Sequence, residues 1–358
     1  MKEITRRKTR VIKIGKCFIG GNNPIAIQSM AKTKTADAEK TIRQIKDLED
    51  AGCEIVRLAV KDIRDATALR KIRNAVKIPI VADIHFDWRL ALAAIENGAD
   101  KIRLNPGNIY KKEELVAIIS ALKQARIPLR IGVNSGSVRS QNSKRLSMSE
   151  RLVASSLSYI KAIERLKFYD IVVSLKASSV LDTVEAYRKI SKLCDYPLHL
   201  GVTATGSPYA GAIKSSIAVG SLLLAGIGDT IRISLTDTAL EEVRVAKCVL
   251  EAVGLRRFGP EIISCPTCGR CEVDLAKIVK DLENKISAVN YGKSGRAIKL
   301  AVMGCVVNGP GEAKEADLGV AFGKKDGLLF KNGKPVKKVS FADCTAVLLR
   351  ELEKNNGW

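Results

Sequence analysis

The stretch that decides the fold is IPIVADIHFDWRLALAAIENGADKIRLNPGN, residues 78–108. Its two ends, 78–86 and 101–108, are short runs rich in β-branched and other apolar residues, which is typical of buried strands. The segment between them, 87–99, has the apolar spacing of an amphipathic helix and carries Gly98 near its end. A strand, a helix and a second strand in this order predict two parallel strands joined by a crossover helix.

The same unit recurs along the first 235 residues. Strand-like runs lie at 24–30, 54–60, 78–86, 101–108, 129–136, 170–178, 197–206 and 230–235. Amphipathic helical patterns separate them, for example at 38–52, 111–126 and 156–167. Eight such strand–helix units predict an α/β protein with a closed TIM-type (β/α)8 barrel, and a doubly wound open sheet is the alternative.

Polar residues mark the carboxyl ends of the predicted strands. Residues that share a strand face pair a cation with an amide or hydroxyl group, namely Arg103 with Asn105, Arg130 with Asn134, Lys176 with Ser174, and Arg232 with Ser234. A cation within a buried strand is costly unless it is paired, so a surface role explains these residues poorly. Together with Arg57 they place five cations at one end of the barrel. Arginine forks suit phosphate oxygens, which predicts a substrate with more than one phosphate group, although Asp83 and Asp87 are carboxylates that could pair with some of the cations.

Other polar residues at these strand ends are candidates for the chemistry. Asp83 and His85 follow the third strand, and Gln28 and Ser29 belong to the first. Barrel enzymes keep their catalytic groups at this end, so Asp83 and His85 are predicted catalytic residues. His199 is the second of only two histidines and also lies in a predicted strand. The sequence contains no glycine-rich dinucleotide fingerprint, Walker loop or nucleophile elbow.

The pattern changes after residue 257, which predicts two domains, 1–257 and 258–358. The second part contains CPTCGRC at 265–271, a helical pattern at 272–289, a strand at 298–305, a Gly-Pro-Gly loop at 309–311 and a strand at 318–323. A hairpin through 331–334 and a last helix at 343–355 complete it. This order predicts a small α+β domain.

Cysteines give the second domain its chemistry. Cys265 and Cys268 form a CxxC pair, and Cys305 supplies a third thiolate. Three thiolates with Glu312 suit an iron–sulfur cluster whose fourth iron has a weaker, harder ligand, whereas structural zinc wants four Cys or His ligands. Cys271 extends the pair to CxxCxxC and is an alternative fourth ligand.

Composition limits the class of protein. The 358 residues carry a formal net charge of +22, but only 4% are aromatic, which leaves few stacking platforms for nucleic-acid bases. Nine cysteines in a chain of this size favour thiols or metal ligands over a disulfide framework. No apolar run is long enough to span a membrane and no secretory signal is evident, so we expect a cytoplasmic protein. A zinc-stabilised basic RNA-binding protein is the alternative function.

A family resemblance joins these features. The motifs QSM, VADIHFD, RLNPGN, RIGVNSGS, SLKAS, LHLGVT, GIGDTIRISL, CPTCGR and GCVVNGPGE resemble those of the 4-hydroxy-3-methylbut-2-enyl diphosphate synthases of the non-mevalonate isoprenoid pathway. The likeness covers almost the full length, in the short two-domain bacterial form. It implies a [4Fe-4S] cluster on Cys265, Cys268, Cys305 and Glu312. It also implies phosphate binding by Arg57, Arg103, Arg130, Asn134, Lys176, Arg232 and Ser234.

The resemblance also implies a reaction and partners. The substrate would be 2-C-methyl-D-erythritol 2,4-cyclodiphosphate, which is opened and reductively dehydroxylated with electrons from reduced flavodoxin or ferredoxin. The family forms a head-to-tail homodimer in which the cluster domain of one chain closes the barrel of the other. Two positions depart from the family pattern: Ala204 stands where a glutamate is common, and Cys271 is not a usual family residue.

Overall fold

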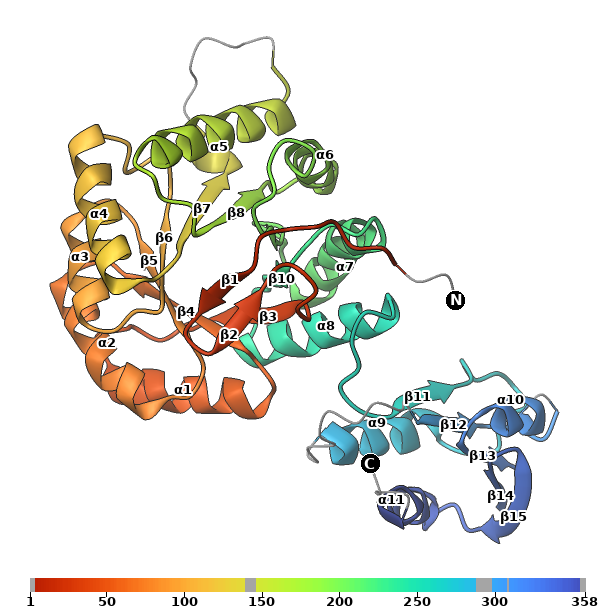
Figure 1. Ribbon diagram of the computed structural model, residues 1–358. Helices are drawn as coiled ribbons and strands as arrows, with labels where there is room; N and C mark the ends of the chain where they lie inside the picture. Colours follow the sequence, from red (N-terminus) through yellow and green to blue (C-terminus); the bar gives the residue numbers. More distant parts are fainter. Residues whose placement is uncertain (1–3, 139–145, 288–297, 308, 355–358) are drawn as a thin grey trace. The chain divides into compact units, whose positions relative to one another are not determined.

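The computed structural model describes residues 4–138, 146–287, 298–307 and 309–354 (Figure 1). The chain divides into two compact units, Met1–Arg256 and Arg257–Trp358. We call them the barrel unit and the cysteine unit and describe each by itself.

Eight parallel strands form the core of the barrel unit. They are β3 (Ala26–Met30), β4 (Ile55–Val60), β5 (Ile80–Ile84), β6 (Lys101–Leu104), β7 (Leu129–Asn134), β8 (Ile171–Lys176), β9 (His199–Leu200) and β10 (Thr230–Ile231). Each strand from β3 to β8 pairs with the next one in sequence, β9 pairs with β10, and β10 pairs with β3. A bridge between Val173 and Leu198 joins β8 to the start of β9. The ring of strands is therefore closed, so the TIM-type barrel is confirmed and the open-sheet alternative is wrong.

Helices cover the outside of the barrel, as Figure 1 shows. They are α1 (Ala38–Asp50), α2 (Ile63–Ala75), α3 (Arg89–Glu96), α4 (Lys112–Ala125), α5 (Met148–Arg165), α6 (Val180–Ile190), α7 (Pro208–Leu224) and α8 (Ala239–Ala252). Several begin at side-chain caps, and α5 has a complete capping box between Ser147 and Glu150. Each packs an apolar stripe on the strands, such as Ile42, Ile45 and Leu48 of α1.

A short hairpin closes the amino end of the barrel. Its antiparallel strands β1 (Ile12–Ile14) and β2 (Cys17–Ile19) have no counterpart in the elements expected from the sequence. Their isoleucines pack against the first or second residues of barrel strands, among them Ala26, Ile55, Val81 and Val172. The apolar hairpin fills this end, which leaves the carboxyl ends of the strands for the chemistry.

The cysteine unit is a five-stranded sheet in the order β11 (Glu261–Ser264), β12 (Lys299–Met303), β13 (Leu318–Phe322), β14 (Gly327–Lys331) and β15 (Lys334–Val339). The first three strands are parallel, and the last two add on as antiparallel strands. Helices α9 (Leu275–Ser287) and α11 (Cys344–Lys354) pack on one face and α10 (Gly309–Glu315) on the other. The expected small α+β domain is confirmed.

Three details of this unit differ from the sequence-based expectation. The Gly-Pro-Gly segment is not a loop but the first turn of α10. A proline is accepted there because the first backbone N–H groups of a helix have no intrahelical partner. Strand β11 was not expected, and α9 begins at Leu275 rather than at residue 272. Residues 288–289 of the expected helix, and residue 355 of the last one, lie outside the described residues.

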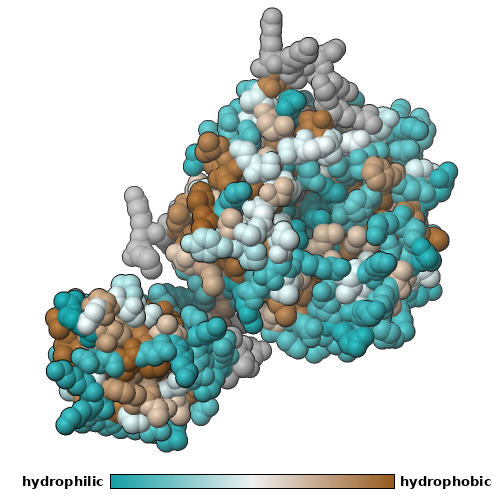
Figure 2. Space-filling model, turned by 180° about the vertical axis from the view of Figure 1, so that it is seen from behind, coloured by the Kyte–Doolittle hydropathy of each residue, from teal (hydrophilic) through white to brown (hydrophobic). Residues whose placement is uncertain are grey.

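The surface seen in Figure 2 is largely hydrophilic, with hydrophobic residues in smaller groups. Among the described residues, no helix combines the length and the apolar character that crossing a membrane requires.

Candidate active site

The strands bring the predicted cations together inside the barrel. Arg57 of β4, Arg103 of β6, Arg130 of β7 and Lys176 of β8 point inward, and Arg232 follows directly after β10. Arg103 lies beside Asp83 on one neighbouring strand and beside Arg130 on the other. Arg130 and Lys176 are only 1% and 5% exposed. The predicted convergence of five cations is therefore present in the structure.

Asp83 lies at the centre of this group. Its Oδ1 accepts a hydrogen bond from Arg103 Nη1 at 3.1 Å, and its Oδ2 lies 3.4 Å from Arg57 Nη2. Burial alone would raise the pKa of the Asp83 carboxyl, but the positive charges of Arg57 and Arg103 outweigh burial and lower it to about 2. Asp83 is therefore a permanent anion at neutral pH.

Two glycines make room for the cations. A Cβ atom on Gly132 would clash with the Arg103 guanidinium, and one on Gly201 would clash with Lys176 Nζ. Arg103 also donates from Nη2 to the Gly132 carbonyl at 2.9 Å. Any larger residue at these two positions would displace the side chains that line the barrel interior.

Of the five cations, Arg130 and Lys176 have the fewest partners to balance their positive charge. Arg130 Nη1 donates to Gln28 Oε1 at 3.0 Å, and no carboxylate among the described residues forms an ion pair with either cation. Burial lowers the pKa of both groups well below their ordinary values, and the neighbouring cations lower them further. A bound anion would relieve both effects.

Glu242 is a site residue that the sequence analysis missed. It is 1% exposed and reaches from α8 to Arg232, whose Nε and Nη2 donate to its carboxylate at 3.2 and 3.0 Å. Ser29 Oγ donates to the same carboxylate at 3.2 Å, and Lys32 Nζ lies 3.3 Å from it. The sequence indicates only that Glu242 is buried, because it falls on the buried stripe of α8 with Ala239, Val243 and Ala246.

The charge balance favours an anionic ligand. Five cations line the interior, and the two carboxylates that pair with them are Asp83 and Glu242. The prediction that Asp87 pairs with one of these cations is wrong. Its Oδ1 lies 3.5 Å from Arg89 Nη1 at the exposed start of α3 instead. The excess of positive charge in a buried site is the kind of arrangement that binds phosphate groups.

The remaining predicted residues take supporting positions. Ser234 Oγ accepts a hydrogen bond from Arg232 Nη1 at 2.6 Å. Asn105 Nδ2 donates to Ser137 Oγ at 2.8 Å and its Oδ1 accepts from the Gly107 amide, so this side chain shapes the loop after β6. Asn134 ends β7, and in the amide orientation that satisfies both ends its oxygen accepts from Arg103 Nη2 at 3.3 Å. The described contacts of Asn105 and Asn134 are thus with the protein itself.

The two histidines lie in different environments. His85 Nε2 is 3.8 Å from Asp83 Oδ2, and the side chain is 38% exposed. His199 opens β9 and is fully buried, with Nδ1 2.7 Å from Thr230 Oγ1. Burial lowers the pKa of His199 well below its ordinary value, so this ring stays neutral. Only His85 combines solvent access with contact to the central carboxylate.

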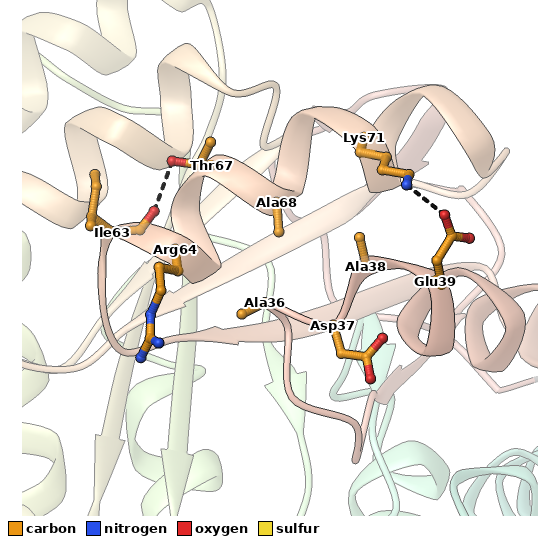
Figure 3. A pocket seen from close by; sticks show the side chains of 9 residues that line it. All are labelled: Ala36, Asp37, Ala38, Glu39, Ile63, Arg64, Thr67, Ala68 and Lys71. Carbon is orange, nitrogen blue, oxygen red and sulfur yellow. Dashed lines mark hydrogen bonds and ion pairs between the residues drawn. The ribbon is translucent and has the colours of Figure 1, made fainter.

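The structure holds a surface hollow of about 610 Å³ between α1 and α2. Figure 3 shows its lining, in which Lys71 forms an ion pair with Glu39. None of its nine lining residues belongs to the interior cation group, and its charged side chains form ion pairs with nearby surface residues. The hollow is thus separate from the candidate active site.

In the cysteine unit, the thiols follow the carboxyl ends of two neighbouring strands. Ser264 of β11 lies beside Val302 of β12, so Cys265 and Cys305 leave the sheet at the same edge. The Gly304 amide donates to Cys265 Sγ at 3.4 Å. Cys268 is exposed in the following turn, and Glu312 is exposed in the first turn of α10.

Cys271 has a different environment. Its Sγ donates to the Val273 carbonyl at 3.2 Å, and its side chain packs against the apolar core of the unit. A Cβ atom on Gly304 would clash with this sulfur, so glycine at 304 is needed for the packing. These contacts are those of a structural cysteine.

The donor atoms of the cysteine unit suit an iron–sulfur group in their chemistry, although they are not gathered around one point. No three Cys, His, Asp or Glu side chains among the described residues are close enough together to hold a metal ion. The donor chemistry nevertheless fits, because soft thiols leave adjacent strand ends and a backbone amide points at one sulfur, as expected around an anionic cluster.

Comparison with known proteins identifies the family. A family model described as the GcpE TIM-barrel domain matches residues 9–247, and one described as the GcpE protein C-terminal domain matches residues 261–354. The chain belongs to the GcpE family. This confirms the family resemblance seen in the motifs.

Relatives of this GcpE-family chain carry a specific name. A protein of Caldanaerobacter subterraneus named 4-hydroxy-3-methylbut-2-en-1-yl diphosphate synthase (flavodoxin) is 51% identical over 351 residues, 98% of each chain. The protein of the same name from Fusobacterium nucleatum is 51% identical over 97% of this chain and 96% of its own length. Among solved structures, dihydropteroate synthase from Stenotrophomonas maltophilia matches with a TM-score of 0.52 at 12% identity, covering 67% of this chain and 98% of its own. That likeness supports the barrel fold alone.

Proposed function

We propose that this chain is a 4-hydroxy-3-methylbut-2-enyl diphosphate synthase, an iron–sulfur oxidoreductase of isoprenoid biosynthesis. It converts 2-C-methyl-D-erythritol 2,4-cyclodiphosphate to 4-hydroxy-3-methylbut-2-enyl diphosphate by ring opening and reductive dehydroxylation. The observation that carries the proposal is the group of five cations with two carboxylate partners among the described residues, in a chain that is 51% identical to relatives of that name. Nothing in the comparisons favours the zinc-stabilised RNA-binding alternative.

The barrel cations bind the substrate through its two phosphate groups. Lys176 is the last residue of β8 and Arg232 follows β10, whereas Arg57, Arg103 and Arg130 extend from within their strands. Arg130 and Lys176 are only 1% and 5% exposed. Asn105, Asn134 and Ser234 complete the substrate-binding set. The same cations stabilise the phosphate oxygen that becomes free when the ring opens, because negative charge increases there.

Asp83 and His85 have different catalytic roles. Asp83, with a pKa of about 2, remains an anion and orients Arg57 and Arg103. Its Oδ2 also lies 3.8 Å from His85 Nε2, so the negative charge of Asp83 is close to the ring. His85 is therefore the group that delivers a proton to the departing hydroxyl, which leaves as water. Ala204 has no ionisable group to share this task, since its exposed side chain is a methyl group.

Four residues of the cysteine unit hold the cofactor, namely Cys265, Cys268, Cys305 and Glu312. A [4Fe-4S] cluster bound there supplies electrons one at a time and offers one iron with an exchangeable ligand. Glu312 would be the weaker, exchangeable ligand, because a lone carboxylate binds iron less strongly than a thiolate does.

The assembly and the electron source complete the proposal. Reduced flavodoxin, or ferredoxin, delivers the electrons in the cytoplasm. The active site forms in a homodimer, with the cysteine unit of one chain closing the barrel of its partner, as the family resemblance implies.

Metal analysis tests the proposal. The protein is purified without oxygen, and iron, acid-labile sulfide and zinc are measured per chain. The expected result is about four iron and about four sulfide. About one zinc without sulfide would overturn the proposed function and return the RNA-binding alternative.

A further inference from the structure

A turn next to the proposed cluster ligands carries unusual charge. The β13–β14 turn, residues 323–326, directly follows β13, and Ala321 of that strand lies beside Met303 of β12. The turn therefore lies at the same sheet edge as Cys305. A Cβ atom on Gly323 would stand 3.4 Å from Val306 Cγ1, so Val306 packs directly against the turn.

Four lysines gather at this corner of the sheet. Lys324 and Lys325 are exposed in the turn. Strand β15 runs parallel to β13, since each is antiparallel to β14, so Lys337 and Lys338 near its carboxyl end reach the same edge. Lys338 Nζ lies 3.1 Å from Asp326, whereas the other three have no ion-pair partner among the residues described. We call Lys324, Lys325, Lys337 and Lys338 the lysine corner.

Exposed apolar residues adjoin the lysine corner. Val306 and Val307 follow Cys305 and are 63% and 61% exposed. These two exposed valines lie between the predicted cluster ligands and the lysine corner. Apolar residues beside a set of charged ones resemble the apolar centre and charged rim of a transient protein interface.

We propose that the lysine corner, with Val306 and Val307, is the docking surface for an acidic electron-carrier protein, a flavodoxin. This inference rests on the proposed function, which places the electron-accepting cofactor at Cys305. Exposed lysines steer an acidic partner and speed its approach, and the valines give the short-lived complex an apolar contact. In each encounter the carrier is oxidised by one electron and the cysteine unit is reduced by one.

The opposite edge of the same sheet supplies a matched control. Lys299 and Lys334 are the first residues of β12 and β15, are exposed, and lie at the amino edge, away from Cys305. Replacing both by glutamate changes the net charge as much as replacing Lys324 and Lys325 does. The two double variants therefore differ in the place of the charge and not in its amount.

The first experiment measures binding and needs no turnover. Oxidised flavodoxin is titrated with the full-length cluster-loaded protein at several salt concentrations, and its flavin fluorescence anisotropy gives the Kd. For Lys324→Glu/Lys325→Glu we expect a Kd about tenfold higher and a shallower salt dependence, because two rim attractions become repulsions. The Lys299→Glu/Lys334→Glu control should stay within about twofold of the unchanged protein. Equal effects of the two variants would overturn the docking proposal, since only the total charge would then matter.

A second measurement separates this inference from the proposed function. Turnover driven by reduced methyl viologen, a small dye that needs no docking surface, should be the same in the unchanged protein and in Lys324→Glu/Lys325→Glu. Turnover driven by flavodoxin should show a raised KM for flavodoxin in that variant only. No turnover with the dye in any form would refute the proposed function while the binding result still decides the docking surface. An unchanged Kd for flavodoxin with a weakened Kd for a short RNA would assign the corner to nucleic acid instead.

Discussion

Two carboxylates in the barrel pair with some of the interior cations and leave the others without a countercharge in the part of the chain that the structure describes. Asp83 pairs with Arg57 and Arg103, and Glu242 pairs with Arg232, so each carboxylate fixes guanidinium groups without neutralising the whole set. Arg130 and Lys176 form no ion pair with a carboxylate among the described residues, and we propose that they bind the ligand. The protein accepts a cost in stability at this site, because buried cations without partners are unfavourable until an anion binds.

Loss of the ion pair between Glu242 and Arg232 should affect both stability and substrate binding. Glu242→Gln keeps the size of the side chain but leaves Arg232 buried without a countercharge. The free energy of unfolding should fall by about 3 kcal/mol, and the KM for the cyclic diphosphate should rise because Arg232 loses its fixed position. Chemical denaturation and steady-state kinetics measure the two effects. The control is Glu241→Gln, which removes an exposed ion pair with Arg244. In this variant the free energy of unfolding and the KM should hardly change.

Lys101 gives a prediction of the opposite sign. Its Nζ is fully buried at the first residue of β6 and has no hydrogen-bond partner, and burial lowers its pKa well below the ordinary value. At pH 7 the Lys101 amine is charged in the unfolded chain. In the folded chain its burial disfavours the charged form, so this amine reduces the stability of the fold. Lys101→Met should therefore raise the free energy of unfolding by about 1–3 kcal/mol in a denaturant titration. A loss of stability would show that the amine has a bound partner, such as a buried water.

His199 gives a pH dependence. Its pKa is lowered in the fold, so the unfolded chain binds a proton below about pH 6.5 that the folded chain does not. Stability is therefore full above that pH and falls as the pH drops, by up to about 1.4 kcal/mol per pH unit from this group. In His199→Gln, the difference in unfolding free energy between pH 7 and pH 5.5 should be smaller than in the unchanged protein. An identical difference in both proteins would contradict the assignment.

At the scale of elements, the existence of the barrel strands was predictable, whereas short or irregular elements were not. The strand ends were less predictable, since the run at 197–206 contains only the strand His199–Leu200. All eight barrel strands follow from apolar runs, and the cations were recognised because Arg103 and Arg130 interrupt such runs. The β1–β2 hairpin escaped prediction because its strands have three residues each. Helix α10 escaped because Gly-Pro-Gly is typical of a turn. Glu242 was missed since α8 lies outside the barrel, and no local pattern shows that it reaches Arg232.

The loop after β11 gives a prediction about the cluster. Cys271 packs into the core and donates to Val273, so it is not expected to bind iron. Cys271→Ser should keep the full iron and sulfide content, and Cys305→Ser should lose most of it, as measured by chemical analysis and visible absorption of protein purified without oxygen. A Cys271→Ser variant without iron, beside a Glu312→Gln variant that keeps it, would exchange the roles of these two residues.

At the scale of the whole molecule, the net charge of +22 is divided between different tasks. Inside the barrel, a few cations form an anion site, while the lysine corner of the cysteine unit presents positive charge to solvent. Composition alone could not separate these two uses, because a charge count does not tell buried from exposed. The family and the fold were accessible from the sequence, whereas the partners of each charge needed coordinates.

The most direct test of the central claim is turnover of the cyclic diphosphate. The protein, purified without oxygen, is incubated with 2-C-methyl-D-erythritol 2,4-cyclodiphosphate and reduced flavodoxin, and the phosphorus NMR spectrum is followed. We expect the signals of the cyclic diphosphate to be replaced by those of a linear diphosphate, and Arg130→Met to abolish the conversion. An unchanged spectrum from cluster-loaded protein, with flavodoxin and with reduced methyl viologen alike, would contradict it.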